Sequence, residues 1–176
     1  MKSATGVRLV LSCIAFAIAP SASAVTSTGT FQVLINIAKA CSVTAGPTSN
    51  INLGSVNSSA TNTTGNSTIS VNCSKTTPYF IGLAPSTANG GNTSGAGAMS
   101  SVANSATNTD KVPYQLNQTS ATGPAWGNTA TSTTVGNGVA GTGSGLAQTY
   151  TVYATAPGAN YTPDSYADTV TVNVNY

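Results

Sequence analysis

The most regular stretch of the sequence is TVTVNVNY, residues 169–176. Apolar and polar side chains alternate along it, so that Val170, Val172, Val174 and Tyr176 share one face of an extended chain. This period of two is typical of a β-strand with one buried face. Because no further strand follows Tyr176, we expect one edge of this strand to lack a neighbour, and an open apolar edge is a hazard that proteins normally cover.

Other segments of the chain also have the character of strands, whereas helix-forming residues are scarce. The segments lie at residues 30–37, 41–45, 68–73, 79–83, 112–116 and 149–153. They are rich in Thr, Val, Ile and Tyr and are bounded by Gly, Asn and Pro, which favours short strands. Pro113 predicts an edge position or a strand start for its segment. The pattern predicts an all-β sandwich of one domain.

Three polar stretches separate these strands, at residues 47–66, 85–109 and 123–145. Their abundance of Gly, Ser, Thr and Asn predicts loops, with residues 129–135 as a candidate short strand. The two long stretches exceed ordinary connections, so we expect them to form exposed surface. The alternative is that they are disordered linkers.

Charge is unusually rare in this chain. Only 5% of its 176 residues are charged and it contains no His, whereas a typical soluble domain is about 25% charged. All three acidic residues are Asp, so His and Glu, the commonest general acids and bases, are both missing. Five Lys and Arg residues make no basic patch for nucleic acid. We therefore expect neither an enzyme with catalytic residues nor a nucleic-acid partner.

Residues 1–24 have the pattern of a secretory signal peptide. Lys2 and Arg8 accompany an apolar run at residues 9–18, and Ala22-Ser23-Ala24 is a cleavage site of the A-x-A type. A transmembrane anchor is the alternative, but the run is about half the length that a span needs. We expect the mature chain to begin at Val25, with three Lys and three Asp and no net charge.

The cysteines support export. Cys13 would leave with the signal peptide, and the remaining pair, Cys41 and Cys73, predicts one disulfide in an oxidising compartment. It would close a loop of about thirty residues and stabilise the fold by roughly 3–4 kcal/mol in the chain-entropy model. Two free thiols or a metal site are the alternatives, but two Cys without His make no zinc site. We expect no metal and no cofactor.

Two further features allow more than one interpretation. Asp164 and Asp168 lie four residues apart and could bind Ca²⁺, but three Asp in the whole chain favour ordinary turn and strand-start residues. Trp126, between Pro124 and Gly127, could stack on a sugar or fill the core, and the core position is favoured.

Several motifs together resemble one known family. They are FQVLINI (31–37), CSV (41–43), ISVNC (69–73), VPYQL (112–116) before Trp126-Gly127, QTYTVY (148–153) and YADTVTVNVNY (166–176). The chain resembles the spore coat protein U domain, whose family includes subunits of archaic (Csu-type) chaperone–usher pili. Two features depart from the family: Ala154 stands where a Gly is usual, and the middle loops are richer in Gly, Ser and Thr than in a pilus rod subunit.

The resemblance implies an immunoglobulin-like β-sandwich that lacks its last strand, here at residues 38–176. In related pilins a periplasmic chaperone lends a strand to the open groove. At the outer-membrane usher, the N-terminal extension of the next subunit replaces that strand. The matching extension is residues 25–37, whose donor face would be Phe31, Val33, Ile35 and Ile37. The acceptor groove, which the chaperone would also contact, would be lined by Val170, Val172, Val174 and Tyr176.

The spacing of the chain favours a neighbouring copy as the acceptor. Only Ala38, Lys39 and Ala40 separate the donor segment from Cys41, a reach of about 10 Å at full extension. That is roughly one sheet-to-sheet spacing, so folding back to the far edge of the same sandwich would be strained. The alternative is that residues 30–37 are the first strand of a complete sandwich.

The leading hypothesis is therefore a structural subunit of a surface pilus that supports adhesion or biofilm formation. It would cross the inner membrane, pass through the periplasm and reach the cell surface. Its partners would be copies of itself or related pilins, a chaperone and an usher. Two alternatives stay open: a secreted spore or cell coat protein without fibres, and a secreted carbohydrate-binding module that uses Trp126.

Overall fold

The computed structural model describes residues 22–176, so the predicted signal peptide lies, except for its last three residues, outside the described residues. The chain divides into two compact units, residues up to Asn36 and Ile37–Tyr176. In the first unit, residues 22–36 form neither helix nor strand. The single chain thus gives no support to the alternative that residues 30–37 are the first strand of a complete sandwich, since no strand forms there.

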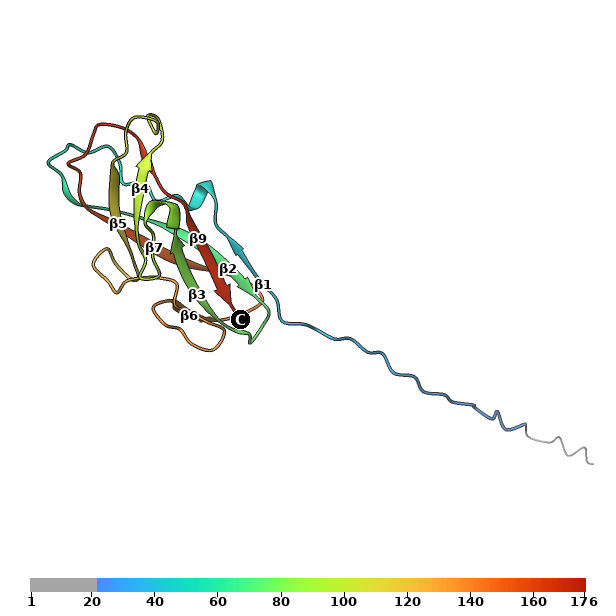
Figure 1. The fold of residues 1–176 in the computed structure, drawn as a ribbon. Helices are drawn as coiled ribbons and strands as arrows, with labels where there is room; N and C mark the ends of the chain where they lie inside the picture. The colour runs from blue at the N-terminus through green and yellow to red at the C-terminus, as the bar shows by residue number, and fades with distance from the viewer. Residues whose placement is uncertain (1–21) are drawn as a thin grey trace, which may run out of the picture. The chain divides into compact units, whose positions relative to one another are not determined.

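The second unit is built from two antiparallel sheets (Figure 1). The larger sheet has the strand order β1-β2-β7-β5-β4-β8. Its strands are β1 (Cys41–Thr44), β2 (Thr61–Cys73), β7 (Ala147–Gly158), β5 (Lys111–Asn117), β4 (Ala96–Ser101) and β8 (Tyr166–Ala167). The smaller sheet has the order β6-β3-β9, formed by β6 (Val139–Thr142), β3 (Pro78–Pro85) and β9 (Val170–Asn175). The predicted all-β, immunoglobulin-like fold is thus confirmed.

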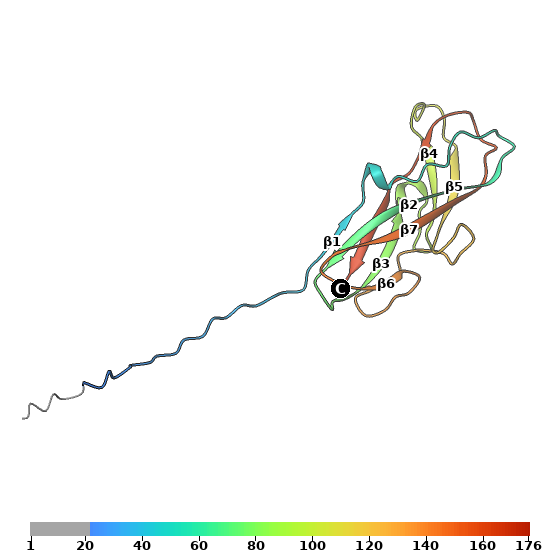
Figure 2. The same ribbon diagram turned by 180° about the vertical axis from the view of Figure 1, so that it is seen from behind.

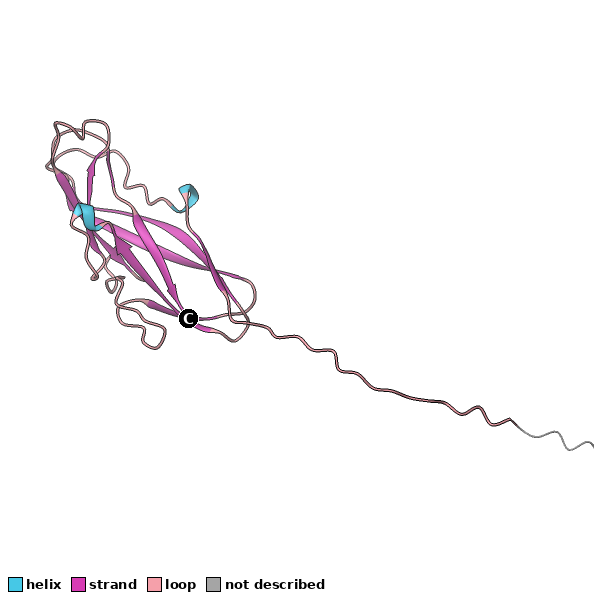
Figure 3. Cartoon of the chain, turned by 45° about the vertical axis from the view of Figure 1, so that its right-hand side comes forward, coloured by secondary structure: helices cyan, strands magenta, loops and turns pink. Residues whose placement is uncertain are grey.

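Helix is confined to two short 3₁₀ turns in residues 22–176, η1 (Pro47–Ser49) and η2 (Thr87–Asn89) (Figure 3). The longest pairing joins β2 to β7, with Asn66 opposite Tyr153 in the middle of the ladder. These two strands are the longest in the described chain, and the view from behind shows them side by side (Figure 2).

The core lies between the sheets and is assembled from alternate positions on their strands. Ile69 and Val71 of β2 face Ile81 and Leu83 of β3, and all four are buried in one hydrophobic cluster. The other buried members are Cys73, Tyr79, Tyr114, Leu116, Trp126, Val152 and Ala154. The long strands therefore each contribute one face to the core, as a period of two requires.

The three stretches predicted as loops contain regular structure that the sequence did not suggest. Residues 61–66 belong to β2, β4 lies within residues 85–109, and β6 lies within residues 123–145. The candidate strand at residues 129–135 is wrong, because no strand forms there. Strand β4, AGAMSS, is difficult to recognise because it consists mostly of small residues of low β-propensity, and β6, VAGT, because it has only four residues with Ala and Gly in the middle.

The small residues of β4 and β6 are required by close packing. A Cβ atom on Gly97 of β4 would collide with the ring of Tyr114, and one on Gly141 of β6 would collide with Tyr79 and Tyr150. Strand β5 is an inner strand rather than an edge, and Pro113 is its third residue. The proline is tolerated because the pairing of β5 with β7 begins only at Gln115.

Candidate functional site: an apolar groove beside β9

Strand β9 is paired along one edge only. It forms an antiparallel ladder with β3, from Val170 opposite Pro85 to Asn175 opposite Phe80. Within residues 22–176 no strand pairs with its other edge, because β9 is last in the order β6-β3-β9. An edge of this kind presents unpaired backbone N–H and C=O groups that can template another strand.

The inner face of β9 is apolar and only partly covered. Val170, Val172 and Val174 pack against the core cluster but remain half-exposed, and Tyr176 is 49% exposed. The alternation predicted from the sequence therefore does place the three valines on one inward face. Their role as contacts for another chain stays a prediction.

A groove of about 480 Å³ runs alongside this face. One wall is Val170 and Val172 of β9 together with residues 166–169, and the opposite wall is the segment between β1 and β2. Of the four predicted groove residues, Val174 and Tyr176 do not line this groove. The floor is the core itself, through Ile69, Leu83, Met99, Tyr114, Leu116, Val152 and Ala154. Apart from Met99 these floor residues are themselves buried, so the apolar surface that the groove leaves open to water belongs to Met99 and to the walls. Folded monomers seldom leave such a groove open unless it binds something.

The second wall was not anticipated from the sequence. After β1 ends at Thr44 the chain continues with η1, and Ile51 and Leu53 pack against the core. The segment lies so close to β2 that a Cβ atom on Gly65 would touch Ile51 and Leu53. The alternation of Ile51, Asn52 and Leu53 was the signal that could have revealed this wall, but it is only three residues long.

One end of the groove is polar. The Asp168 carboxylate, which lines the groove just before β9, accepts hydrogen bonds from Tyr114 Oη at 2.7 Å and Asn89 Nδ2 at 2.7 Å. The backbone N–H of Ser86 adds a longer contact of 3.4 Å. Burial, reinforced by the hydrogen bond from its hydroxyl to Asp168 and by the charge of that carboxylate, raises the pKa of Tyr114 above its usual value.

The predicted donor residues are exposed. Phe31, Val33 and Ile35 are each 87% exposed and Ile37 is 80% exposed, so none of their side chains is covered in the single chain. The regular domain begins only at Ala40, which is anchored to Ser74. The Ala40 N–H donates to Ser74 Oγ at 3.0 Å, and the Ala40 carbonyl accepts from the Ser74 N–H at 2.8 Å.

The predicted disulfide is present between Cys41 and Cys73. These residues lie directly opposite each other at the start of the β1–β2 ladder, and Cys73 is buried. The bond therefore fastens the beginning of the domain to the end of β2.

Trp126 fills the core, as favoured by the sequence, and the sugar-stacking alternative is wrong. Its side chain is 1% exposed, and its indole Nε1–H donates to the carbonyl of Ile81 at 2.9 Å. A ring enclosed in this way cannot stack on a ligand. The carbohydrate-binding module that would have used Trp126 loses its binding platform.

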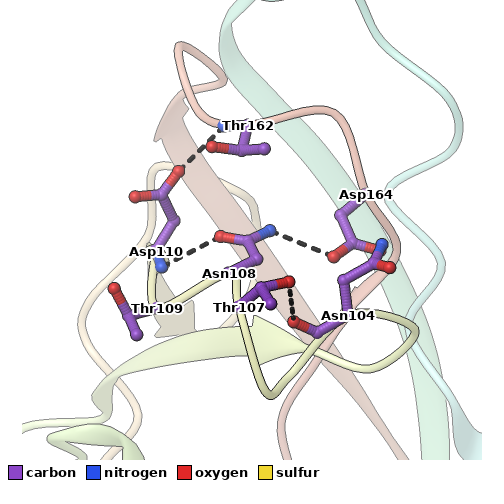
Figure 4. A pocket seen from close by; sticks show the side chains of 7 residues that line it. All are labelled: Asn104, Thr107, Asn108, Thr109, Asp110, Thr162 and Asp164. Atoms are coloured by element: carbon purple, nitrogen blue, oxygen red, sulfur yellow. Dashed lines mark hydrogen bonds between the residues drawn. The ribbon is translucent and has the colours of Figure 1, made fainter.

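A second, polar hollow of about 260 Å³ lies between the β4–β5 loop and the chain before β8 (Figure 4). Its acceptors are already engaged: Asp110 accepts from the Thr162 N–H, and Asp164 accepts from Ser101 Oγ and Asn108 Nδ2. The hydrogen bonds to Asp164, of which that from Ser101 has the largest effect, lower the pKa of this carboxyl group to about 2.

Asp164 and Asp168 thus belong to different networks. Asp164 lines the polar hollow, whereas Asp168 lines the apolar groove. The described part of the chain contains no group of three or more His, Cys, Asp or Glu residues placed to hold a metal ion. The same residues include no helix long and apolar enough to cross a membrane.

Comparison with known proteins places this sandwich in a family. Residues 27–173 match the Spore Coat Protein U domain. The chain belongs to this family. Strands β1 to β8 and the first four residues of β9 therefore lie within the matched Spore Coat Protein U domain, as does the exposed segment at residues 31–37.

Among solved structures, the chain is similar to one in the crystal structure of the CsuC–CsuE chaperone–tip adhesion subunit pre-assembly complex, from the archaic chaperone-usher Csu pili of Acinetobacter baumannii. The sequence identity is 20% and the TM-score is 0.47. The similarity covers 80% of this Spore Coat Protein U domain chain and 40% of the solved chain. Among curated proteins, no significant match is found.

Proposed function

We propose that this protein is a structural subunit of a surface pilus that assembles by donor-strand exchange. Residues 31–37 of one copy would fill the groove beside β9 of the next copy. The observation that carries the proposal is that one chain has both of the parts that such a joint needs. It has an unfilled apolar groove next to an unpaired strand edge, and it has an exposed apolar segment with matching alternation.

The energetics support such a joint. Burying Phe31, Val33, Ile35 and Ile37 contributes roughly 6–12 kcal/mol before the cost of ordering the segment. Backbone hydrogen bonds along the free edge of β9 add to this, as in other cases of strand addition. A strand inserted there would also shield the half-exposed valines of β9 and the partly buried Ile51, Leu53 and Met99.

The chain direction favours a head-to-tail fibre. Strand β1 begins at Cys41, opposite Cys73 at the end of β2, and only residues 74–77 separate β2 from the start of β3. The end of β9 lies at the same end of the sandwich, because Asn175 pairs with Phe80 (Figure 1). A donor segment that enters the domain at this end can link it to the opposite end of a neighbour, and repetition gives a fibre.

Before assembly the groove would need a temporary cover. A periplasmic chaperone that lends a strand, and an outer-membrane usher at which the strand is exchanged, would supply the export route. Membership of the Spore Coat Protein U domain family supports this route, since the resemblance described above implies a subunit of an archaic chaperone–usher pilus. The fibre would then act in adhesion or biofilm formation at the cell surface.

The test is assembly of the exported chain carrying Ile35→Asp and Ile37→Asp, followed by size-exclusion chromatography and electron microscopy. We expect fibres from the wild-type protein and monomers from this variant. Leu34→Asp is the matched control, because Leu34 is equally exposed but lies on the other face of an extended segment. Fibres that persist in the double variant contradict donor-strand exchange, and a coat layer without fibres from the wild-type protein supports the alternative of a non-fibrous coat protein.

A further inference from the structure

Asp168 is a negative charge at the end of an apolar groove. It is half-buried, and its hydrogen-bond partners among residues 22–176 are the neutral groups of Ser86, Asn89 and Tyr114. The nearby cation Lys111 donates through Nζ to Asn89 Oδ1 at 2.5 Å. It therefore hydrogen-bonds to a partner of the Asp168 carboxylate and not to the carboxylate itself. A half-buried carboxylate surrounded by neutral groups is stabilised when a cation approaches it.

The chain direction decides which donor residue reaches this end. In a head-to-tail joint, the donor's own domain lies beyond the end of the acceptor that carries Asp168, because its donor segment leaves from the end that carries Cys41. The later residues of the donor segment then lie near Asp168 and the earlier ones near Tyr176. The donor strand therefore runs antiparallel to β9.

The donor segment carries a cation in the matching place. Alternation continues beyond Ile37, so that Lys39 shares the face of the four apolar donor residues. An antiparallel register with Ile37 across from Val170 places Ile35 across from Val172 and Val33 across from Val174. The same register places Lys39 across from Asp168. Four apolar side chains and one cation thus face three valines, one tyrosine and one carboxylate.

Other registers are worse for a physical reason. A shift by one residue turns the apolar face of the donor away from the groove. A shift by two in one direction carries Lys39 across from Val170, where a cation in apolar surroundings is costly unless it is paired. A shift by two in the other direction withdraws Ile37 from the valines and sets it against Asp168. Deeper insertion is also opposed by Ala40, which is anchored to Ser74 of its own domain.

We propose that Lys39 of one copy pairs with Asp168 of the next and fixes the register of the donor strand. This inference rests on the proposed donor-strand exchange. Lys39 acts as a register-determining residue, and the apolar side chains provide most of the affinity.

The test is disulfide trapping in full-length exported chains with paired cysteines. Ile35→Cys with Val172→Cys reports the expected register, and Ile35→Cys with Val170→Cys or Val174→Cys reports the two slipped registers. Residues directly opposite in an antiparallel ladder have Cα atoms about 4.5–5.5 Å apart, within the Cα separation of about 4.4–6.8 Å that a disulfide spans. With Lys39 present we expect covalent multimers from the first pair only, on non-reducing gels.

Lys39→Gln should raise the cross-linking of the slipped pairs about tenfold, as expected for the loss of one hydrogen bond to a charged group. Lys39→Arg should keep the single register, and Lys75→Gln, which removes an exposed cation from the β2–β3 turn, should leave the pattern unchanged. An unaltered pattern in Lys39→Gln overturns the pairing of Lys39 with Asp168. Cross-linking in none of the three pairs, with Lys39 intact, instead contradicts donor-strand exchange itself.

Discussion

The hydroxyl of Tyr114 donates a 2.7 Å hydrogen bond to the carboxylate of Asp168, which lies on the short connection from β8 of the larger sheet to β9 of the smaller one. Tyr114 belongs to β5 of the larger sheet, whereas Asp168 lies two residues before β9 of the smaller one. The bond fixes the point at which the chain crosses to form β9. It also closes the polar end of the groove.

Removal of this bond should destabilise the domain. In Tyr114→Phe the phenyl ring can keep its buried place, but Asp168 loses a partner in a half-buried setting. A hydrogen bond to a charged group contributes about 1.5–3 kcal/mol, and we expect the free energy of unfolding to fall by about that amount. Urea denaturation followed by circular dichroism measures it. Tyr153→Phe, on the outer face of β7, is the control and should change stability little.

Asp164 should make stability depend on pH in the acid range. Its pKa is lowered to about 2, chiefly by the hydrogen bond from Ser101, against about 3.9 for an ordinary Asp. A lowered pKa in the folded state stabilises the protein above the ordinary pKa, and that contribution is lost as the pH falls from about 4 to about 2. Wild type should therefore be more stable than Asp164→Asn at pH 6.

The measurement is the denaturation midpoint of both proteins between pH 7 and pH 2. The two curves should approach each other toward the acid end, because Asp164 is then protonated in the unfolded state and becomes protonated in the folded state as the pH nears its folded-state pKa of about 2. A gap that stays constant down to pH 2 would show that the charge of Asp164 does not contribute to stability. Asp164→Asn should not impair fibre assembly, because Asp164 lines the polar hollow rather than the groove.

Trp126 should act as a structural residue. In Trp126→Phe, the Ile81 carbonyl loses the indole hydrogen bond in a buried site, and a smaller ring leaves unfilled space. We expect a loss of about 2–4 kcal/mol in the free energy of unfolding. Circular dichroism during denaturation is the measurement, because the variant has no Trp for fluorescence. A variant as stable as the wild type would contradict the core role.

The sequence is informative where strands are long or strongly alternating. Strand β9, the disulfide between Cys41 and Cys73, and the core position of Trp126 all follow from local patterns. Strands β4 and β6 do not, because Gly97 and Gly141 must be small to make room for tyrosine rings, most of which belong to strands distant in the sequence. In the sequence alone, a glycine that is required by a bulky neighbour across the core cannot be distinguished from a glycine in a loop.

The groove could be predicted only in part for the same reason. The valine face of β9 is a local pattern, so the sequence reveals one wall. The other wall depends on Ile51 and Leu53 packing over Gly65, and the floor on Met99 from a strand that the composition concealed. Asp168 could be recognised as a strand-start residue, but its place at the groove end depends on the distant partners Tyr114 and Asn89.

The disulfide should matter more for assembly than its effect on stability alone suggests. Strand β1 is held by only four residue pairs with β2, and the groove wall at residues 45–53 follows directly after it. In the double variant Cys41→Ala, Cys73→Ala, we expect a loss of roughly 3–4 kcal/mol in the free energy of unfolding. The loosened β1 should also leave that wall less well placed to receive a donor strand.

The matched control is Gly141→Ala, which destabilises β6 through the collision with Tyr79 and Tyr150. Strand β6 lies at the far edge of the smaller sheet, with β3 between it and β9, so the groove keeps both walls. At a temperature where both variants remain folded, fibre yield should fall further in the cysteine variant than in Gly141→Ala. Equal yields at equal stability would mean that the bond contributes only to the folding of the domain.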